Sequence, residues 1–433
     1  IALGMLWGLL RRLPLPEIKQ KYFIFGLLVI GLLMVPNFSF GDREHIIMLG
    51  LIPFVLVQAA LHLRADVPKT LSIPALIFGT IGVLVKPHYG LIPTVLMLWR
   101  FWSHKDCRFY KAPDFWALTL GVITYGGILI TLFPDYLNVI MPDVIALYLP
   151  HTNPYVLQEM FVFGFVTLCI GVTALTFDIH REQKTIIKWL MVVTFLLFVP
   201  YLVQGKGFDY HRIPWMLSFS ALIGVIAYSL IGKQANNVVT SIIATVLVIG
   251  ILWAVRPLPF ERPSHTQFRS LPLSQLIEKE CPKPCSFLLL NDTSELIHQL
   301  VIYHDATHAS RFTSMWYMLP LIQHEKSLRE GEDGVLPDEE YKAMKAKYTD
   351  MVAQDLLDYQ PELIIELETL RVGDPEFDFI DFYRSNPQFE DAFAAYEHTQ
   401  TFRFNPLVYF AGLNTKYNSR DQIEFSIYKK HQN

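Results

Sequence analysis

The chain has 433 residues, of which 52% are hydrophobic and 18% are charged, and its formal net charge is -4 at pH 7. Soluble globular domains carry roughly 25% charged residues, so this composition excludes an ordinary soluble protein. No basic stripe in the sequence indicates a nucleic-acid partner.

The hydrophobic bias is uneven along the chain. Up to about Val255, apolar runs of roughly membrane-spanning length dominate, whereas from Arg256 onward the sequence has the composition of a soluble domain. We therefore expect an α-helical polytopic membrane domain over residues 1–255, followed by a small soluble α/β domain over residues 256–433.

Ten apolar runs predict about ten membrane segments. They are residues 1–10, 22–35, 46–63, 70–85, 89–102, 115–133, 160–177, 189–203, 215–232 and 238–255. The first is too short to span a bilayer, so we expect that the chain begins inside a helix and that residues are missing upstream. The runs 70–85 and 89–102 are also short and flank Lys86-Pro-His-Tyr-Gly90, which predicts a re-entrant loop or a broken helix.

Lys and Arg fall in one set of alternate loops, which predicts that these loops are cytoplasmic. This set comprises residues 11–21, 64–69, 100–111, 181–188 and 233, and its charges, Arg100 included, are expected to be ordinary membrane anchors. The other set comprises residues 36–45, 86–90, 134–159, 204–214 and everything after 255, and we expect it to face outward. The loop 134–159 contains no Lys or Arg, in agreement with this assignment.

Three clusters of ionisable side chains lie in the outward set. They are Phe40-Gly-Asp-Arg-Glu-His45, Lys86-Pro-His-Tyr89 and Gln204-Gly-Lys-Gly-Phe-Asp-Tyr-His-Arg212. A charged, Gly-broken segment at the ends of membrane helices is costly unless it lines a wet cavity or binds a ligand. We therefore predict an active site on the outward face of the membrane.

The cationic side chains of these clusters suit a phosphate or pyrophosphate leaving group, because Arg binds phosphate as a fork and Lys acts as a point charge. The predicted donor-binding residues are Arg43, Lys86, His88, Lys206, Tyr210, His211 and Arg212. Gly205 and Gly207 would let backbone N–H groups approach phosphate oxygens closely. Asp42 and Glu44 are candidates for a general base or for ligands of a divalent cation.

Each cluster also has a purely structural interpretation. Asp42 precedes an apolar run and could be a helix N-cap, while its two charged neighbours could be interfacial charges that reach water. Lys86 could be a turn charge followed by aromatic interface anchors, and residues 204–212 could form a polar turn between helices. In the outward loop 134–159, Asp143 and His151 are expected to be solvated.

Taken together, the three motifs resemble those of bacterial polytopic GT-C type glycosyltransferases, distant relatives of protein O-mannosyltransferases and lipid A aminoarabinose transferases. The resemblance implies a GT-C-like fold, a polyprenyl-phosphate-linked sugar donor, an outward active site and inversion at the anomeric carbon. In this family the catalytic carboxylate usually lies in the first outward loop, after the first helix. That loop is missing here, so the base could lie upstream of Ile1, and Asp42 and Glu44 remain candidates only.

We accordingly predict an integral membrane glycosyltransferase of a bacterial inner membrane, with its active site and C-terminal domain outside the cytoplasm. Its partners would be membrane lipids, the lipid-linked donor, and a glycan, lipid or protein acceptor. Two alternatives remain. A transporter or flippase for a lipid-linked glycan should carry buried ionisable residues toward both leaflets, whereas here they gather on one face. A non-catalytic scaffold with a partner-binding tail would leave the three clusters unexplained.

The tail alternates predicted strands and helices, which is typical of a compact α/β domain. The strands are expected at 286–291, 363–365 and 423–428, and the helices at 295–303 and Asp338–Tyr359. Phe389, Phe393 and Tyr396 fit one face of an amphipathic helix and should belong to the core. The tail has no nucleophile–base spacing, so we expect it to bind an acceptor or to cap the membrane site.

The four cysteines differ by predicted compartment. Cys107 and Cys169 are expected to be free. Cys281 and Cys285 lie in the outward tail, where an oxidising compartment would allow a local disulfide. Their spacing alone does not make a zinc site, because no second Cys/His pair with ligand spacing follows.

Overall fold

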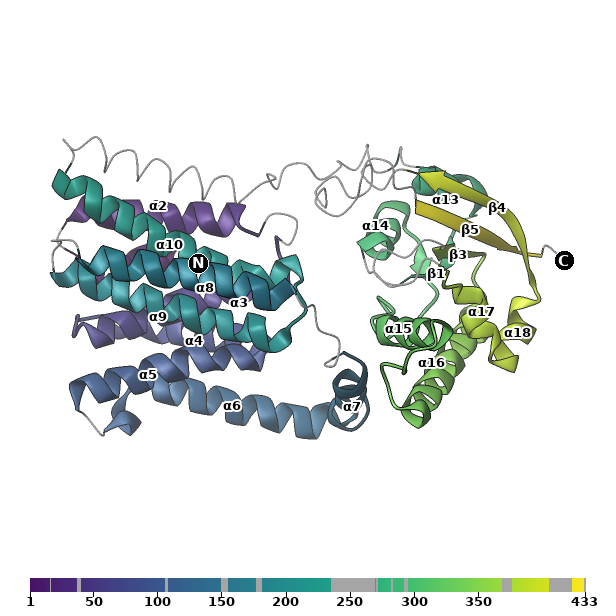
Figure 1. Cartoon of the computed structure of the whole chain (residues 1–433), viewed down its shortest axis with the longest axis horizontal. Helices are drawn as coiled ribbons and strands as arrows, with labels where there is room; N and C mark the ends of the chain where they lie inside the picture. The colour runs from purple at the N-terminus through teal and green to yellow at the C-terminus, as the bar shows by residue number, and fades with distance from the viewer. Residues whose placement is uncertain are drawn as a thin grey trace. The chain divides into compact units, whose positions relative to one another are not determined.

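The structure is a computed structural model that describes residues 1–15, 17–36, 40–105, 108–148, 155–176, 181–234, 269, 272–281, 283–291, 295–367, 376–404 and 423–431. The chain forms two compact units, both drawn in Figure 1. The first unit comprises Ile1–Met141 and His151–Phe260, and the second comprises Pro142–Pro150 and Glu261–Asn433. The segment Pro142–Pro150, which was predicted to belong to the membrane domain, groups with the second unit.

The first unit is helical. Its main helices are α1 (Ala2–Arg12), α2 (Ile18–Met34), α3 (Arg43–His62), α4 (Lys69–Val85), α5 (Leu91–His104), α6 (Pro113–Leu132), α8 (Tyr155–Thr176), α9 (Arg181–Gln204) and α10 (Asp209–Gln234). The predicted apolar runs from 1–10 to 215–232 coincide with these helices, and the run 238–255 lies outside the described residues. Five helices, namely α3, α6, α8, α9 and α10, are long and apolar enough to cross a membrane, which supports a membrane protein.

The break between α4 and α5 confirms the interruption predicted at Lys86-Pro-His-Tyr-Gly90. Helix α4 ends at Val85, Lys86 has extended backbone angles (φ −140°, ψ 95°), and a 3₁₀ turn, Pro87–Gly90, leads into α5. Proline disfavours the helical conformation in the residue before it, so the sequence itself forces Lys86 out of the helix. The turn places Lys86 at a helix end, where a charged side chain can reach polar partners.

Helix α3 lies at the centre of the first unit, because 14 of its 20 residues are buried. It packs against α4 through small residues that let the two backbones approach closely. A Cβ added at Gly79 of α4 would collide with the side chain of Phe54 and would lie 2.9 Å from the carbonyl oxygen of Gly50. Helix α6 differs, since Asp114 is its one buried residue and its apolar surface is otherwise accessible.

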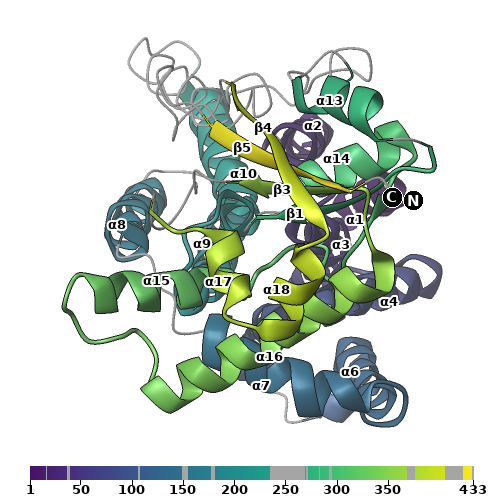
Figure 2. The ribbon, with the colours of Figure 1, turned by 90° about the vertical axis from the view of Figure 1, so that its right-hand side faces the viewer.

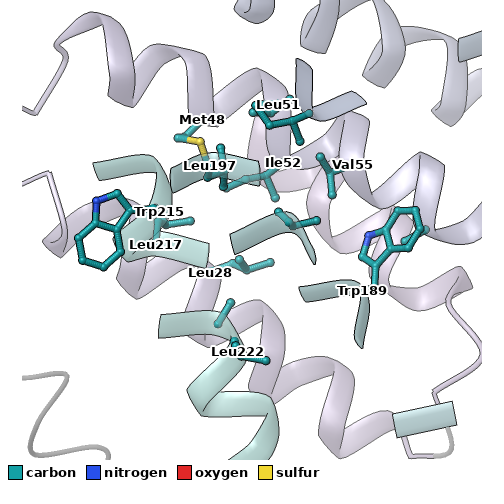
Figure 3. Packing of buried hydrophobic residues seen from close by; sticks show 14 of the residues in the cluster. Leu28, Met48, Leu51, Ile52, Val55, Trp189, Leu197, Trp215, Leu217 and Leu222 are labelled. Carbon is teal, nitrogen blue, oxygen red and sulfur yellow. The ribbon is translucent and has the colours of Figure 1, made fainter. Parts of the chain in front are cut away.

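A largely apolar core joins α1, α2, α3, α9 and α10, and part of it is drawn in Figure 3. Leu28, Leu51 and Leu197 of three different helices meet there, each at most 7% exposed. The core encloses a cavity of about 90 Å³ with an apolar lining. Packing of this kind holds the helix ends in register, and the polar clusters lie at those ends.

The second unit contains a five-stranded sheet in the order β2-β1-β3-β5-β4. The strands are β1 (Ser286–Leu290), β2 (Thr307–His308), β3 (Leu363–Leu367), β4 (Tyr396–Phe404) and β5 (Ile423–Lys430). Strands β1, β2 and β3 are parallel, while β5 pairs antiparallel with both β3 and β4. The sheet confirms the coarse prediction of a small α/β domain after the helical part.

Helices cover both faces of this sheet, as Figure 2 shows. Alternate side chains of β1 point to opposite faces, so Phe287 and Leu289 join one core and Leu288 and Leu290 the other. The first core includes residues of α13 (Pro272–Glu280) and α14 (Glu295–His304). The second includes residues of α15 (Met318–Arg329), α16 (Asp338–Tyr359), α17 (Phe379–Arg384) and α18 (Pro387–Phe393). Strands that are buried on both faces explain the apolar runs Phe287–Leu290 of β1 and Leu363–Ile365 of β3.

The structure corrects the predicted helix around Phe389–Tyr396 and decides the state of Cys281 and Cys285. Phe389, Phe393 and Tyr396 are all buried as expected, but only the first two lie on a helix. Helix α18 ends at Phe393, and Tyr396 begins β4, where it pairs with Lys430. Cys281 and Cys285, whose state the spacing left open, form a disulfide. Cys169 is free, and Cys107 lies outside the described residues.

Asp143 is not a solvated loop residue as predicted. Its exposed fraction is 6%, because its carboxylate accepts hydrogen bonds from Lys347 and Tyr348 of α16. These partners lie some 200 positions further along the chain, so no local pattern could reveal them. His151, the other residue expected to be solvated, lies outside the described residues.

Candidate functional site

The three predicted clusters all lie at helix ends of the first unit. Asp42 is the N-cap position of α3, although its side chain makes no capping hydrogen bond. Lys86 follows the last residue of α4, and the third cluster joins the end of α9 at Gln204 to the start of α10 at Asp209. Helix ends expose unpaired backbone groups, so polar side chains are tolerated there more readily than in mid-helix.

Glu44, Lys86 and His211 form a buried polar group, here called the Glu44 cluster. The Lys86 ammonium donates a hydrogen bond to Glu44 Oε1. His211 Nε2 lies 3.5 Å from the same carboxylate oxygen and 3.5 Å from Lys86 Nζ. Glu44 and His211 are each only 1% exposed, and a carboxylate so deeply buried requires such partners. One residue from each predicted motif therefore meets at a single point.

The aromatic ring of Tyr210 completes one wall of the Glu44 cluster. Lys86 Nζ lies 5.5 Å from its ring centroid, within range of a cation–π interaction. The ring of Tyr210 also meets that of His211 edge-to-face, with centroids 4.4 Å apart. Tyr210 was predicted as a donor-binding residue, and the structure places it beside the other members.

The charges at the start of α3 act on Lys86. Burial lowers the pKa of Lys86, and the carboxylate of Glu44 raises it. The nearby charge of Arg43 lowers this pKa further, whereas that of Asp42 raises it. Asp42 and Arg43 are themselves exposed, so they lie at the solvent-accessible edge of the cluster.

The segment Gly205-Lys206-Gly207 turns the chain sharply between α9 and α10. Gly205 and Gly207 adopt φ values of +61° and +68°, a left-handed region that side chains rarely enter, so the turn needs glycine at both positions. Lys206 between them is only 2% exposed, and burial lowers its pKa to about 8. Its charge reaches His211, which connects this turn electrostatically with the Glu44 cluster.

His88 lies next to the same group of residues. Gln204 Nε2 is 3.2 Å from His88 Nε2, which ties the turn after α4 to the end of α9. Desolvation and the positive charge of Lys86 lower the pKa of His88 to about 4. The ring is therefore neutral at pH 7 and can accept or donate a hydrogen bond without adding charge.

Arg212 contacts residues of α8 and α9. Its guanidinium pairs with Glu159 of α8 and donates from Nε to the hydroxyl of Tyr201, 3.3 Å away. The same Tyr201 hydroxyl donates to the other carboxylate oxygen of Glu159. Successive residues of a helix point about 100° apart, so His211 and Arg212 meet different neighbours. Glu159 was not predicted as a site residue, although it is the only charged residue of α8.

A second buried polar group lies toward the other end of α3. Arg100 donates to Asp114 over 2.9 Å, and Gln58 donates to the same carboxylate over 3.1 Å. Arg100 is 5% exposed and both partners are 0% exposed. The prediction that Arg100 is an ordinary loop anchor is therefore wrong, because it lies within α5 and pairs with the first turn of α6.

The chemistry of the Glu44 cluster is that of an anion site with one fixed carboxylate. The start of α10 is surrounded by Lys86, Lys206, the exposed Arg43 and the backbone of a glycine turn. The helix dipole at this end of α10 also favours negative charge. Among the described residues, no three His, Cys, Asp or Glu side chains are placed to hold a metal ion. Comparison of the chain with protein-family models, with curated proteins and with solved structures finds no match.

Proposed function

We propose that this chain is a membrane glycosyltransferase of the GT-C type, which transfers a sugar from a polyprenyl-phosphate donor to an acceptor at the outer face of a bacterial inner membrane. The cationic end of the helical unit supports this proposal. So does the resemblance of its three motifs to those of GT-C enzymes. The acceptor would be a glycan, a lipid or a protein.

The observation that carries the proposal is the position of Lys206. It lies between two glycines in left-handed conformations, directly before the N-terminus of α10. A lysine beside a helix N-terminus is a combination that binds phosphate oxygens in many proteins. The N–H of Gly205 is not part of it, because it donates to the Tyr201 carbonyl oxygen over 3.1 Å. The half-buried Lys86 and the exposed Arg43 add positive charge around the same helix end.

In the proposed reaction an acceptor hydroxyl attacks the anomeric carbon of the donor sugar. The bond between that carbon and the phosphate oxygen breaks, and the departing lipid phosphate takes the bonding electron pair. Lys206, Lys86 and Arg43 would stabilise the negative charge that develops on it. The acceptor proton passes to a carboxylate acting as general base.

The two candidate carboxylates suit different roles. Glu44 is buried, and its Oε1 is already bound by Lys86, so we assign it to orienting that lysine. Asp42 is exposed at the start of α3, so a substrate hydroxyl could reach it. Within the residues of this chain, Asp42 is therefore our candidate base, and a divalent cation beside it remains compatible with the proposal.

The proposal is tested with Lys206→Ala in purified protein reconstituted into liposomes with radiolabelled polyprenyl-phosphate sugars. Loss of one group that stabilises the developing charge should reduce the transfer rate by about 10²–10³-fold. The matched control is Lys69→Ala, which removes an exposed lysine from the opposite end of α4. Equal transfer rates in the two variants would remove Lys206 from the mechanism.

A pH series adds a second readout for the same residue. Because the Lys206 pKa is about 8, the wild-type rate should fall as the pH rises through that value and the ammonium loses its proton. Lys206→Arg should keep its charge to a much higher pH, since a guanidinium is not deprotonated in this range. If the transfer rates of both proteins decline over the same pH range, the decline arises from a group other than Lys206.

The buried group at Arg100, Asp114 and Gln58 favours a second candidate, a transporter or flippase for a lipid-linked glycan. From the sequence, a transporter was disfavoured because the ionisable residues were predicted to gather on one face. The structure has them toward both ends of α3. The liposome assay separates the two functions, because a flippase would move the labelled lipid across the bilayer without forming a new glycosidic bond.

A further inference from the structure

Residues 142–148 connect α6 to α8, two helices of the first unit, yet they fold with the second unit. The segment comprises the end of α7 (Met141–Asp143) and the π-helical turn η5 (Val144–Tyr148). No apolar helix of membrane-spanning length interrupts it. The second unit is therefore assembled from two stretches of sequence that are far apart.

A buried charge fixes the start of this segment. Lys347 Nζ lies 2.8 Å and 2.6 Å from the two carboxylate oxygens of Asp143, and the hydroxyl of Tyr348 donates to one of them over 2.8 Å. The Asp143 side chain is 8% exposed and that of Lys347 is 29% exposed. Three hydrogen bonds to a nearly buried carboxylate require a receptor with fixed geometry. Helix α16 supplies both donors from adjacent positions.

An apolar side chain fixes the other end. Leu147 is 0% exposed and belongs to the core that also contains Tyr317 and Tyr348. These two tyrosine rings stack face to face, with centroids 3.7 Å apart and an interplanar angle of 11°. Tyr348 thus contributes its ring to the apolar core and its hydroxyl to Asp143. The contact combines one charge with one buried leucine.

We infer that the surface of α16 around Lys347 and Tyr348 is a built-in binding site for the acidic, leucine-bearing segment 142–148 of the same chain. The segment and the C-terminal fold must then lie on the same side of the membrane. This inference does not depend on the proposed function.

The inference restricts the topology of the chain. Helices α8, α9 and α10 separate the segment from the remainder of the second unit, and three crossings would place the two on opposite sides. A common side requires an even number of crossings. The apolar run 238–255, predicted from the sequence and outside the described residues, would be the fourth.

The length of the chain between Tyr148 and Tyr155 also determines on which side of the membrane α8 begins. Residues 149–154 lead from Tyr148 to Tyr155, and an extended chain over that interval reaches at most about 25 Å. The hydrocarbon core is about 30 Å thick, so the first turn of α8 begins on the same side as the segment. Glu159, the partner of Arg212, lies four residues after Tyr155, at the start of the second turn of α8.

Single-cysteine labelling tests the shared side. Cys107 and Cys169 are replaced by Ser, and either Ile145→Cys or Tyr359→Cys is introduced at a position that is 54% or 50% exposed. An impermeant maleimide is applied to sealed right-side-out vesicles and, in parallel, to permeabilised ones. Both cysteines should react in the same preparation, whereas reaction from opposite sides would overturn the inference.

Hydrogen exchange tests the contact itself in the full chain. Asp143→Asn should increase exchange of the α16 amides around Lys347 by about tenfold or more, because it removes the charge from a nearly buried ion pair. The matched control is Asp135→Asn, an exposed aspartate in the same connection. If the two variants exchange alike, the Asp143 contact does not hold the segment. Neither readout involves transfer activity, so failure here is distinguishable from failure of the proposed function.

Discussion

At the scale of residues, the Glu44 cluster shows how strongly burial separates neighbouring side chains. Asp42 and Glu44 are two positions apart, yet one is exposed and the other is 1% exposed. Burial of Glu44 is acceptable only because Lys86 and His211 surround it. The same contact also fixes Lys86, so the pair shapes the site whether or not it takes part in chemistry.

We predict that Glu44→Gln lowers the free energy of unfolding by about 3 kcal/mol, because it leaves the largely desolvated Lys86 ammonium without a charged partner. Thermal unfolding in detergent measures the loss. Asp42→Asn, which changes an exposed carboxylate in the same turn, should change stability by less than about 0.5 kcal/mol.

A double variant distinguishes loss of the pair from loss of packing. Adding Lys86→Met to Glu44→Gln removes the unpaired charge and should recover most of the lost stability, since apolar replacements of buried pairs are often neutral. If the double variant is less stable than Glu44→Gln, charge pairing does not explain the effect.

Glu366 of β3 gives a prediction for the second unit. It is 2% exposed, and burial, aided by the charge of Asp378, raises its pKa from 4.5 to about 8. The folded state therefore holds a proton that the unfolded state releases. The resulting stabilisation is fully present below about pH 4.5 and is lost as the pH rises to about 8.

We expect the free energy of opening of β3 and β5, measured by native-state hydrogen exchange, to fall between pH 5 and pH 8 by at most roughly 4 kcal/mol. Glu366→Gln carries no titrating proton, so it should flatten this dependence. Glu339→Gln, at an exposed position of α16, should leave the dependence intact. A slope that persists in Glu366→Gln would mean that another group titrates.

At the scale of elements, helix ends and helix crossings have different chemistry. The ends carry the polar clusters, because chain breaks at Lys86 and at Gly205 and Gly207 bring charged side chains out of the apolar helices. The crossing of α3 and α4 is instead built from glycines. Close backbone contact there sets the distance between Glu44 at the start of α3 and Lys86 at the end of α4.

Gly79→Ala should destabilise the first unit by about 1–3 kcal/mol, because the added methyl group would meet the Phe54 side chain and the Gly50 carbonyl. Thermal unfolding in detergent provides the measurement. Gly126→Ala in α6 is the matched control, since its Cβ would meet nothing within 4 Å. Similar melting temperatures for both variants would show that α3 and α4 can move apart without cost.

At the scale of the whole molecule, the connection between α6 and α8 is the feature with the widest consequences. Its residues 142–148 serve as an element of the second unit, so the boundary between the units is not a single point in the sequence. A variant that ends at residue 255 would lack α16, so Asp143 would lose its partners Lys347 and Tyr348. Studies of either function proposed for the helical unit therefore require the full chain.

Local chemistry explains which predictions succeeded. Apolar runs, the proline after Lys86 and the alternation of the tail act within a few residues, so the helices of the first unit, the break at Lys86 and the strands β1, β3 and β5 were predictable. The meeting of the three motifs was also expected, because all three were predicted to lie in loops on the same side of the membrane. The helix face on which each side chain lies could not be predicted. His211 and Arg212 therefore could not be assigned to different sets of partners.

The sequence by itself determined that the chain has an apolar helical part, a small α/β part and polar clusters at particular helix ends, because hydrophobic periodicity and proline chemistry are local. Only the tertiary structure decided that Glu44 rather than Asp42 binds Lys86, that Arg212 turns to Glu159, and that Asp143 docks on α16. Each of these contacts joins residues far apart in the chain. Their geometry depends on how whole helices pack, and a shift of one residue along a helix turns a side chain by about 100° toward different neighbours.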